Sequence, residues 1–193
     1  MKLKNSSAAN VTVALIHHPV VDKNGKTIAA AVTALDLHDI ARSAKTYGAS
    51  AFYVVTPLED QQELVKRIIG HWITGAGAQY NPDRQAALSL IRMQPSLRAT
   101  LRDLEDEHGA RPLVIATSAR NTGNSLSYPD LAALACGNRP IVLLFGTAWG
   151  LADEVMEAAD HRLAPIDGHG DYNHLAVRSA VAIILDRLLG RTN

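Results

Sequence analysis

The side chains best suited to binding a metal gather near the end of this 193-residue sequence. Six of them fall between positions 160 and 174, namely Asp160, His161, Asp167, His169, Asp171 and His174. Carboxylates and imidazoles are common ligands of zinc and other transition metals. Their spacings match no zinc signature, however, and Asp and Gly are also the residues of tight turns. We therefore interpret the stretch as a capping loop with no metal, and keep a metal-dependent hydrolase as an alternative.

Two glycines follow an apolar run in "IVLLFGTAWGL", residues 141–151. The missing side chain of Gly146 leaves room for a ligand beside the backbone, and Gly150 opens a helix. The pair fits neither a dinucleotide fingerprint nor a P-loop, and no lysine follows it. These spacings argue against a nicotinamide dehydrogenase and a P-loop NTPase. A plain strand-to-helix turn explains the same residues.

Three further polar residues are candidates for contact with a ligand. Arg42 falls in the middle of the helical pattern "LDLHDIARSAKTYGA", residues 35–49, and Asp39 stands three residues earlier, so a surface ion pair is the alternative. His17 ends the first apolar run, where it is either a satisfied polar residue or a catalyst. Arg178 lies one turn into the last helix and is expected to point back toward the preceding loop.

The elements that position these residues alternate between apolar runs and helical patterns, which indicates α/β layering. Five runs are predicted to be strands: Val11 to His17, Ala51 to Thr56, Leu113 to Thr117, Ile141 to Phe145 and Arg162 to Ile166. The helices predicted between them run from Asp36 to Tyr47, Leu58 to Trp72, Asp83 to Ile91 and Ser96 to His108. Asp36 is expected to cap the first helix and Gly48 to end it. Such apolar strands are typical of a largely parallel sheet with helices on both faces.

Polar or glycine-rich loops follow the last three predicted strands. They read "SARNTGNS", "GTAWG" and "DGHGDYN". Because ligands of open α/β sheets bind at the carboxyl ends of the strands, we expect these loops to converge on a ligand. The longest loop predicted anywhere in the chain is a different one, from Gly70 to Pro82, and long loops are often functional.

The last helix is apolar on every side in its middle, from Ala180 to Leu185. A helix with no polar face must be covered on more than one flank, so we expect something to pack on both. The loop before this helix supplies Asp171 or Asn173 as a helix start.

The composition restricts the partners and the compartment. Lys and Arg together number 19, as do Asp and Glu, so no global positive field attracts nucleic acid or an anionic membrane, and any RNA site must be local. Cys136 is the only cysteine, which excludes an internal disulfide, and its apolar neighbours predict burial. No signal peptide or membrane-spanning run is visible. We expect one domain over residues 1–193, acting in the cytoplasm without a membrane.

Taken together, three of these stretches resemble the SPOUT methyltransferases. The stretch "DLHDIARSAKTYGA" is similar to the first motif of that superfamily, with Asp36 six residues before Arg42 and Gly48 six residues after it. The stretch "LLFGTAWGL" resembles the second motif, and "LAPIDGHGDYNHLAVRSAVAIILDRL" the third. The closest likeness is to a bacterial family of SAM-dependent RNA methyltransferases, in which "YNHLAVRSA" is a recognisable phrase.

The resemblance implies a site for S-adenosylmethionine. The residues expected around this cofactor are Thr117, Ser118, Phe145, Gly146, Thr147, Gly150, Leu151, Leu163, Pro165, Ile166, Tyr172, Asn173, His174 and Leu175. Arg42 takes the catalytic position, and Asp36, His17 and Arg178 are expected at the substrate.

The same resemblance implies an α/β fold with a C-terminal trefoil knot and a homodimer. The second subunit would cover the outer flank of the last helix, and Arg42 would act in the partner's site. The expected reaction is methyl transfer to a base or ribose of tRNA or rRNA. Besides the hydrolase, a catalytically idle SPOUT-like binding module remains an alternative.

Overall fold

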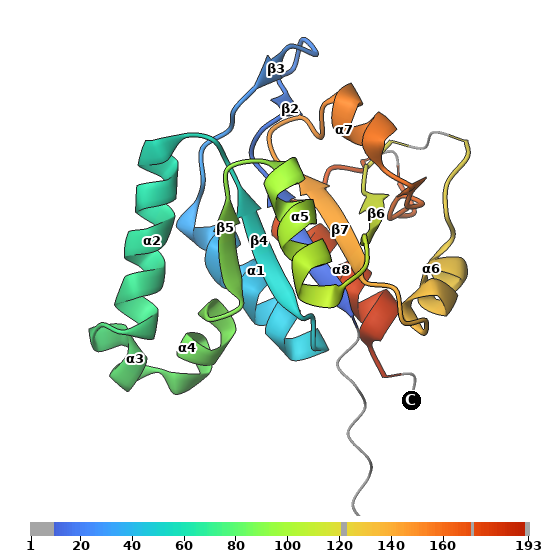
Figure 1. Ribbon diagram of the computed structural model, residues 1–193. Coiled ribbons are helices and arrows are strands. Elements are labelled where there is room, and N and C mark those ends of the chain that lie inside the picture. Colours follow the sequence, from blue (N-terminus) through green and yellow to red (C-terminus); the bar gives the residue numbers. More distant parts are fainter. Residues whose placement is uncertain (1–9, 121–122, 171, 192–193) are drawn as a thin grey trace, which may run out of the picture.

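A six-stranded sheet forms the centre of the chain, with its strands in the order β5-β4-β1-β7-β6-β8 (Figure 1). The computed structural model describes residues 10–120, 123–170 and 172–191. Every neighbouring pair of strands in the sheet is parallel. The strands are β1 (Val11–Ile16), β4 (Ala51–Val55), β5 (Ile91–Gln94), β6 (Leu113–Ala116), β7 (Ile141–Gly146) and β8 (His161–Arg162). The parallel α/β fold predicted from the apolar runs is confirmed.

Helices cover both faces of this sheet (Figure 1). Their bounds are α1 (Ala34–Tyr47), α2 (Glu59–Ile73), α3 (Ala76–Tyr80), α4 (Pro82–Leu88), α5 (Leu97–His108), α6 (Tyr128–Ala135), α7 (Asp153–Ala158) and α8 (Val177–Leu189). Because successive residues of a strand point to opposite faces, Val13 and Leu15 of β1 join one buried cluster, and Ala14 and Ile16 join the other. Residues of α1, α2, α4, α6 and α8 complete the first cluster, and α5 and α7 contribute to the second.

Thr33, rather than the predicted Asp36, caps the first helix. The Thr33 hydroxyl accepts a hydrogen bond from the Asp36 backbone N–H at 3.2 Å and donates one to the Asp36 carboxylate at 2.7 Å. Asp36 therefore lies inside the first turn, where its negative charge also interacts favourably with the positive end of the helix dipole. Gly48 ends the helix as predicted, in the left-handed conformation with φ of 76°.

The prediction of a long loop from Gly70 to Pro82 is wrong. Helix α2 continues through Ile73, and α3 and α4 follow it closely. Asn81 caps α4 by accepting a hydrogen bond from the Arg84 N–H at 2.9 Å. Pro82 is the first residue of α4, where a backbone N–H would have no acceptor within the helix, so the missing N–H of proline costs nothing. Gly75 and Pro82 thus mark the starts of α3 and α4, while Gly70 and Gly77 lie inside helices.

Strand β5 was missed, because Arg92 and Gln94 break its apolar pattern. A strand at the sheet edge has only one neighbour, here β4, and can carry polar residues. A small hairpin of β2 (Val20–Val21) and β3 (Thr27–Ile28) follows β1.

Two smaller predictions are also wrong. Cys136 is exposed just after α6 rather than buried, since Leu131 is the residue by which α6 reaches the core and Leu134 beside Cys136 is exposed. Helix α8 begins at Val177 with Ala176 before it and no side-chain cap, so Asn173 does not start the helix. Asp171 lies outside the described residues.

Helix α8 is covered on one flank by other parts of the same chain. Val181, Ile184 and Leu185 are buried, and the helix packs beside α1 and α6. Ala182 and Ile183 remain partly exposed. The outer side of an apolar helix is therefore incompletely covered.

No helix in the described part of the chain is both long and apolar enough to cross a membrane.

Candidate functional site

A cavity of about 990 Å³ opens at the carboxyl ends of β1, β6 and β7. The strand order reverses its direction here, since β4 and β5 extend the sheet on one side of β1 while β7, β6 and β8 extend it on the other. Open α/β sheets bind ligands at such a point, and the volume lies within the range of cofactor pockets. The late loops converge here as predicted from the sequence.

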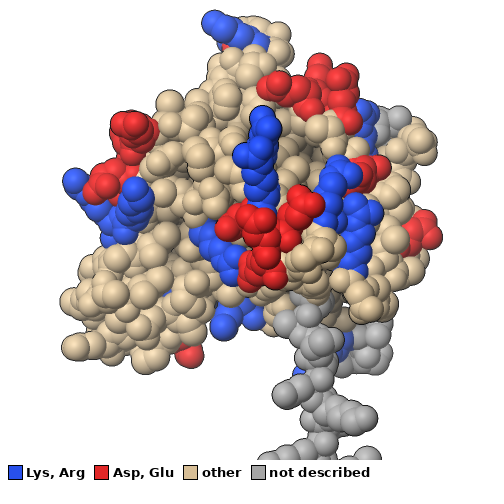
Figure 2. Space-filling view, viewed as in Figure 1, with Lys and Arg blue, Asp and Glu red and all other residues tan. Residues whose placement is uncertain are grey.

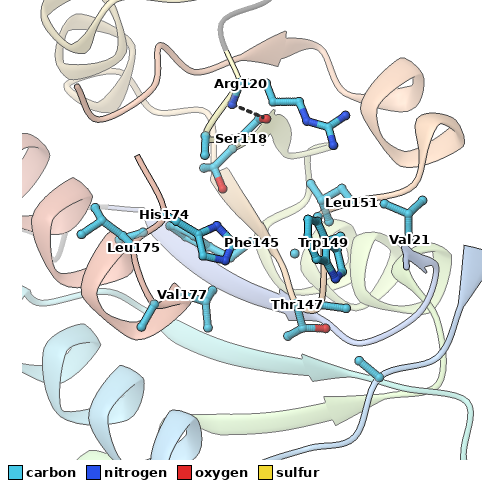
Figure 3. Close-up of a pocket in the computed structure, with 18 of the residues that line it drawn as sticks. Val21, Ser118, Arg120, Phe145, Thr147, Trp149, Leu151, His174, Leu175 and Val177 are labelled. Carbon is cyan, nitrogen blue, oxygen red and sulfur yellow. Dashed lines mark hydrogen bonds between the residues drawn. The ribbon is translucent and has the colours of Figure 1, made fainter. Parts of the chain in front are cut away.

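Most residues expected around a cofactor line this cavity. They are Thr117, Ser118, Phe145, Gly146, Thr147, Gly150, Leu151, Ile166, Asn173, His174 and Leu175. Asp36 and Arg178, expected at the substrate, line it as well. Figure 3 shows Ser118 and Arg120 along one rim, Thr147 and Trp149 along another, and His174 and Leu175 along a third.

Threonine side chains fix two of these loops to the neighbouring strand. The Thr117 hydroxyl donates to the Leu144 carbonyl at 2.8 Å, and the Thr147 hydroxyl donates to the Ile16 carbonyl at 3.0 Å. The backbone N–H of each threonine donates to the same carbonyl. Both loops therefore leave the sheet in a fixed direction, which holds the cavity wall in place.

Three residues expected at the cofactor lie away from the cavity. Leu163 and Pro165 are buried, whereas Arg162, Ala164 and Ile166 line the wall. The segment is extended, and in an extended chain successive side chains point to opposite sides. Tyr172 is 81% exposed and stands outside the lining, with its ring 6.4 Å from that of His174.

The hairpin after β1 forms a wall that the sequence analysis missed. Val21, Asp22, Lys23 and Gly25 line the cavity from this side. The hairpin is joined to the loop after β7, since the Val21 N–H donates to the Gly150 carbonyl at 3.0 Å. Its place after the first strand was a usable signal, because the carboxyl ends of parallel strands share one edge of the sheet.

The missing side chain of Gly146 makes room for the turn that follows β7. A Cβ atom at this position would lie 2.6 Å from the Leu151 nitrogen and 2.8 Å from the Gly150 carbonyl carbon. The space that a side chain at this position would need is therefore filled by the chain's own turn, while Gly146 itself still lines the cavity. A substitution here would disturb the turn first, so it would not be a clean test of cofactor contact.

Arg178 is held by two carboxylates of α1. Its guanidinium lies 3.3 Å from a carboxylate oxygen of Asp36 and 3.5 Å from one of Asp39. Asp36 is buried, so this pair is shielded from water more than a surface pair would be. The contacts tie the start of α8 to α1 at the wall of the cavity.

Arg42 lies outside the cavity of its own chain. Asp36 lines the cavity, and Arg42 is six residues, or about 9 Å, further along the helix. The alternative of a surface pair with Asp39 is not realised, because Asp39 binds Arg178. Arg42 is exposed and forms no hydrogen bond or ion pair with any described residue. Its guanidinium is available to a ligand from outside this chain.

His17 is fully buried and does not line the cavity. Burial lowers the pKa of His17 from 6.5 to about 4, against the opposing effect of the nearby Asp36 carboxylate. The imidazole is therefore neutral at physiological pH. Because it is buried outside the cavity, it cannot contact a substrate there directly.

The low pKa of His17 predicts a loss of stability in mild acid. The unfolded chain protonates this imidazole near pH 6.5 and the folded chain only near pH 4, so the unfolded state binds more protons in between. The free energy of unfolding should fall by about 3 kcal/mol as the pH drops through this window.

Urea unfolding at pH 7 and pH 4.5 measures the effect. The variant His17→Leu should lose much less stability between the two pH values than the wild type does. His169→Leu, at an exposed histidine, should behave like the wild type. Equal losses in the wild type and His17→Leu would show that His17 is not the group responsible.

The described residues contain no group of three side chains placed to hold a metal ion. Asp160, a candidate ligand, instead accepts a hydrogen bond from the Val114 N–H at 2.8 Å and pairs with Arg111 at 3.4 Å. Asp171 is outside the described residues. The hydrolase alternative therefore has no support in the described part of the chain.

Comparison with known proteins identifies the family of the chain. Residues 10–190 match the family model described as SAM-dependent RNA methyltransferase. The chain is 45% identical over 181 residues to a tRNA (guanine-N(1)-)-methyltransferase of Oleidesulfovibrio alaskensis, covering 94% of this chain and 42% of that protein. The chain thus spans less than half the length of this relative.

Solved structures of methyltransferases share the fold. The TrmH/SpoU tRNA modifying enzyme of A. aeolicus superposes with a TM-score of 0.57 at 17% identity, covering 94% of this chain and 74% of that one. The AdoMet bound rRNA methyltransferase of Sinorhizobium meliloti gives a TM-score of 0.54 at 18% identity, covering 94% and 56%.

The resemblance to SPOUT methyltransferases expected from the three motifs is therefore confirmed in sequence and in fold. Two of these motifs, the second and the third, supply two of the segments that line the cavity, and the first supplies α1 beside it. Because the matched family model extends over residues 10–190, the protein belongs to the family of SAM-dependent RNA methyltransferases.

Proposed function

We propose that this chain transfers a methyl group from S-adenosylmethionine to tRNA or rRNA in the cytoplasm, with one domain carrying the activity. The observation that carries the proposal is the cavity, whose walls are the loops after β6 and β7 and the segment leading to α8. The similar methyltransferase of Oleidesulfovibrio alaskensis is more than twice as long as the segment that matches this chain. We therefore take only the class of reaction from it and do not assign the nucleotide that is methylated.

The cavity has the chemistry that this cofactor needs. Phe145, Leu151 and Ile166 provide apolar surface for an adenine ring. No described residue accepts a hydrogen bond from the backbone N–H of His174 or Leu175, so these donors are available to the base or the ribose. The carboxylate of Asp22 suits the positive charge of a sulfonium compound.

When bound, S-adenosylmethionine supplies an activated methyl group on its sulfonium sulfur. The chain's part is to position that group against an acceptor atom, since alignment alone removes a large share of the barrier to such a transfer. The fixed loops after Ala116 and Gly146 and the Asp36–Arg178 pair give the cavity the rigidity that alignment requires.

We also propose that the active form is a homodimer in which Arg42 enters the partner's cavity. The support is twofold: Arg42 is exposed and absent from its own cavity, and α8 keeps Ala182 and Ile183 partly exposed beside α1. A second copy packed on α1 and α8 would cover the apolar flank. Arg42 would then orient the acceptor or stabilise charge that develops on it.

The proposed trefoil knot would place the segment between β8 and α8 behind the loop that follows β6. The two segments do lie against each other, since Leu126 pairs with Leu163 and the Asn173 amide donates to the Ala119 carbonyl at 3.2 Å. These contacts support the proposal because they hold the late segment at the loop through which it would pass.

Transfer of a radiolabelled methyl group from S-adenosylmethionine to unfractionated tRNA and rRNA tests the proposed function. We expect label in one of the two RNA pools, and none when the RNA is digested first. If the protein binds both cofactor and RNA but transfers no label, the idle binding module is the correct alternative and the enzyme is not.

A further inference from the structure

Large apolar side chains are exposed at the mouth of the cavity. Trp149 is 57% exposed, Tyr172 81% and Leu175 44%. The ring of His174 lies 6.3 Å from that of Trp149 and 6.4 Å from that of Tyr172, so it neighbours both aromatic rings. Figure 3 shows Trp149 and His174 on different loops around the cavity. Exposed apolar groups that gather at one site indicate a binding surface.

The loop after β7 holds Trp149 in this exposed position. Its backbone N–H donates to the Val21 carbonyl at 3.0 Å, and the next residue, Gly150, accepts from the Val21 N–H at the same distance. The preceding residue, Ala148, has φ of 52°, in the left-handed region that residues with a side chain rarely adopt. Such strain persists only where the surroundings enforce it, and it concentrates at functional sites.

The charge around the cavity does not favour a site that depends on phosphate contacts. Four basic side chains line it (Lys23, Arg120, Arg162 and Arg178), but so do four acidic ones (Asp22, Asp36, Asp153 and Glu157). Basic and acidic groups also lie side by side on the face shown in Figure 2. The lining itself therefore offers no excess of positive charge to the phosphates of RNA. Stacking on an aromatic ring can supply affinity, because every nucleobase has a flat face whatever the charge of the surroundings.

We propose that Trp149 is the platform on which an unpaired nucleobase of the RNA substrate stacks at the mouth of the cavity. The inference rests on the proposed function and adds a feature of its substrate: the base next to the methyl donor is unpaired and presents its face to the indole. Single-stranded loops of RNA are recognised in this way by aromatic side chains.

Steady-state kinetics on unfractionated tRNA or rRNA, whichever accepts methyl groups, tests the platform. Trp149→Ala should lower kcat/KM for RNA by on the order of ten- to a hundredfold, because stacking on one ring is of that magnitude. Trp149→Phe, which keeps a ring, should recover most of the loss, whereas Trp149→Leu should not. Tyr80→Ala, which removes an aromatic side chain 87% exposed on α3, is the matched control and should leave kcat/KM unchanged.

Fluorescence provides a readout that does not depend on turnover. The chain has two tryptophans, so in Trp72→Phe the emission comes from Trp149 alone. Adding the RNA should quench this emission in a saturable way, while S-adenosylmethionine alone should not.

The outcomes separate this proposal from the proposed function. If the wild type methylates RNA but Trp149→Ala keeps its kcat/KM, the platform is refuted and the enzyme stands. If Trp149→Ala loses affinity for S-adenosylmethionine as much as for RNA, the indole stacks on the cofactor's adenine and the proposal is again overturned. A wild type that neither binds the cofactor nor transfers label fails at the proposed function itself.

Discussion

Replacing Arg42 by alanine should lower methyl transfer by about 100-fold or more while leaving the affinity for S-adenosylmethionine unchanged. Arg42 is exposed on α1 and absent from the lining of its own cavity, so its loss removes no contact to the cofactor there. Its proposed contribution is to the acceptor, at the point where charge develops. Calorimetry and label transfer on the same preparation measure the two effects separately.

Lys45 gives a matched control, because it is another exposed cation on the same helix. Lys45→Ala should retain turnover within a few-fold of the wild type. If Arg42→Ala turns over as fast as Lys45→Ala, the assignment of Arg42 to catalysis is wrong.

Co-expression of two inactive variants tests whether Arg42 acts in the partner's cavity. Arg42→Ala keeps an intact cavity, whereas Ala164→Trp fills the cavity wall but keeps Arg42. Random pairing would make half of the dimers mixed, each with one complete site, so about a quarter of the wild-type activity should return. No recovery would place the action of Arg42 within its own chain.

An acidic residue on the outer flank of α8 should convert the protein to an inactive monomer. Ile183 is partly exposed there, and in the proposed dimer the second copy covers it. Ile183→Asp would bury an unpaired carboxylate at that contact, which costs several kcal/mol and favours dissociation. Size-exclusion chromatography with light scattering should report a single chain, and label transfer should fall to the level of Arg42→Ala.

The control for this variant is Leu134→Asp, at a residue 39% exposed on α6. That protein should keep the oligomeric state and the activity of the wild type. A wild type that is already monomeric and active, or a monomeric Ile183→Asp with full activity, would contradict the dimeric site.

The sequence was most informative about the strands that position the cavity. Runs such as Val11 to His17 and Ile141 to Phe145 are largely apolar because the strands of a parallel sheet are buried on both faces. Few other short elements require apolar side chains on both faces, so the pattern is specific. The loops at their carboxyl ends could be placed together for the same reason, since parallel strands end at one edge. The cavity residues from Thr117 to Ser118 and from Phe145 to Leu151 follow directly.

Local patterns were misleading where the meaning of a residue depends on tertiary structure. Gly75 and Pro82 are typical of loops, yet here they stand at the starts of α3 and α4, which pack against each other and against α2. Leu163 and Pro165 have the apolar character of a pocket wall, but the register of their extended segment turns them to the core.

Partners far apart in the sequence were equally out of reach. Arg178 and Asp36 meet across 142 positions, and only the packing of α8 against α1 brings them together. Gly146 was rightly singled out for its lack of a side chain, but only the fold shows that the turn at Leu151 occupies the space beside it.

The central claim is that the cavity at the ends of β1, β6 and β7 binds S-adenosylmethionine, and calorimetry on the purified protein tests it most directly. Titration should give saturable heat at one site per chain. Ala164→Trp, on the cavity wall, should abolish that heat, and Ala86→Trp, at an exposed position on α4, should not. Absence of binding to the wild type, or equal binding to the wild type and Ala164→Trp, would contradict the claim.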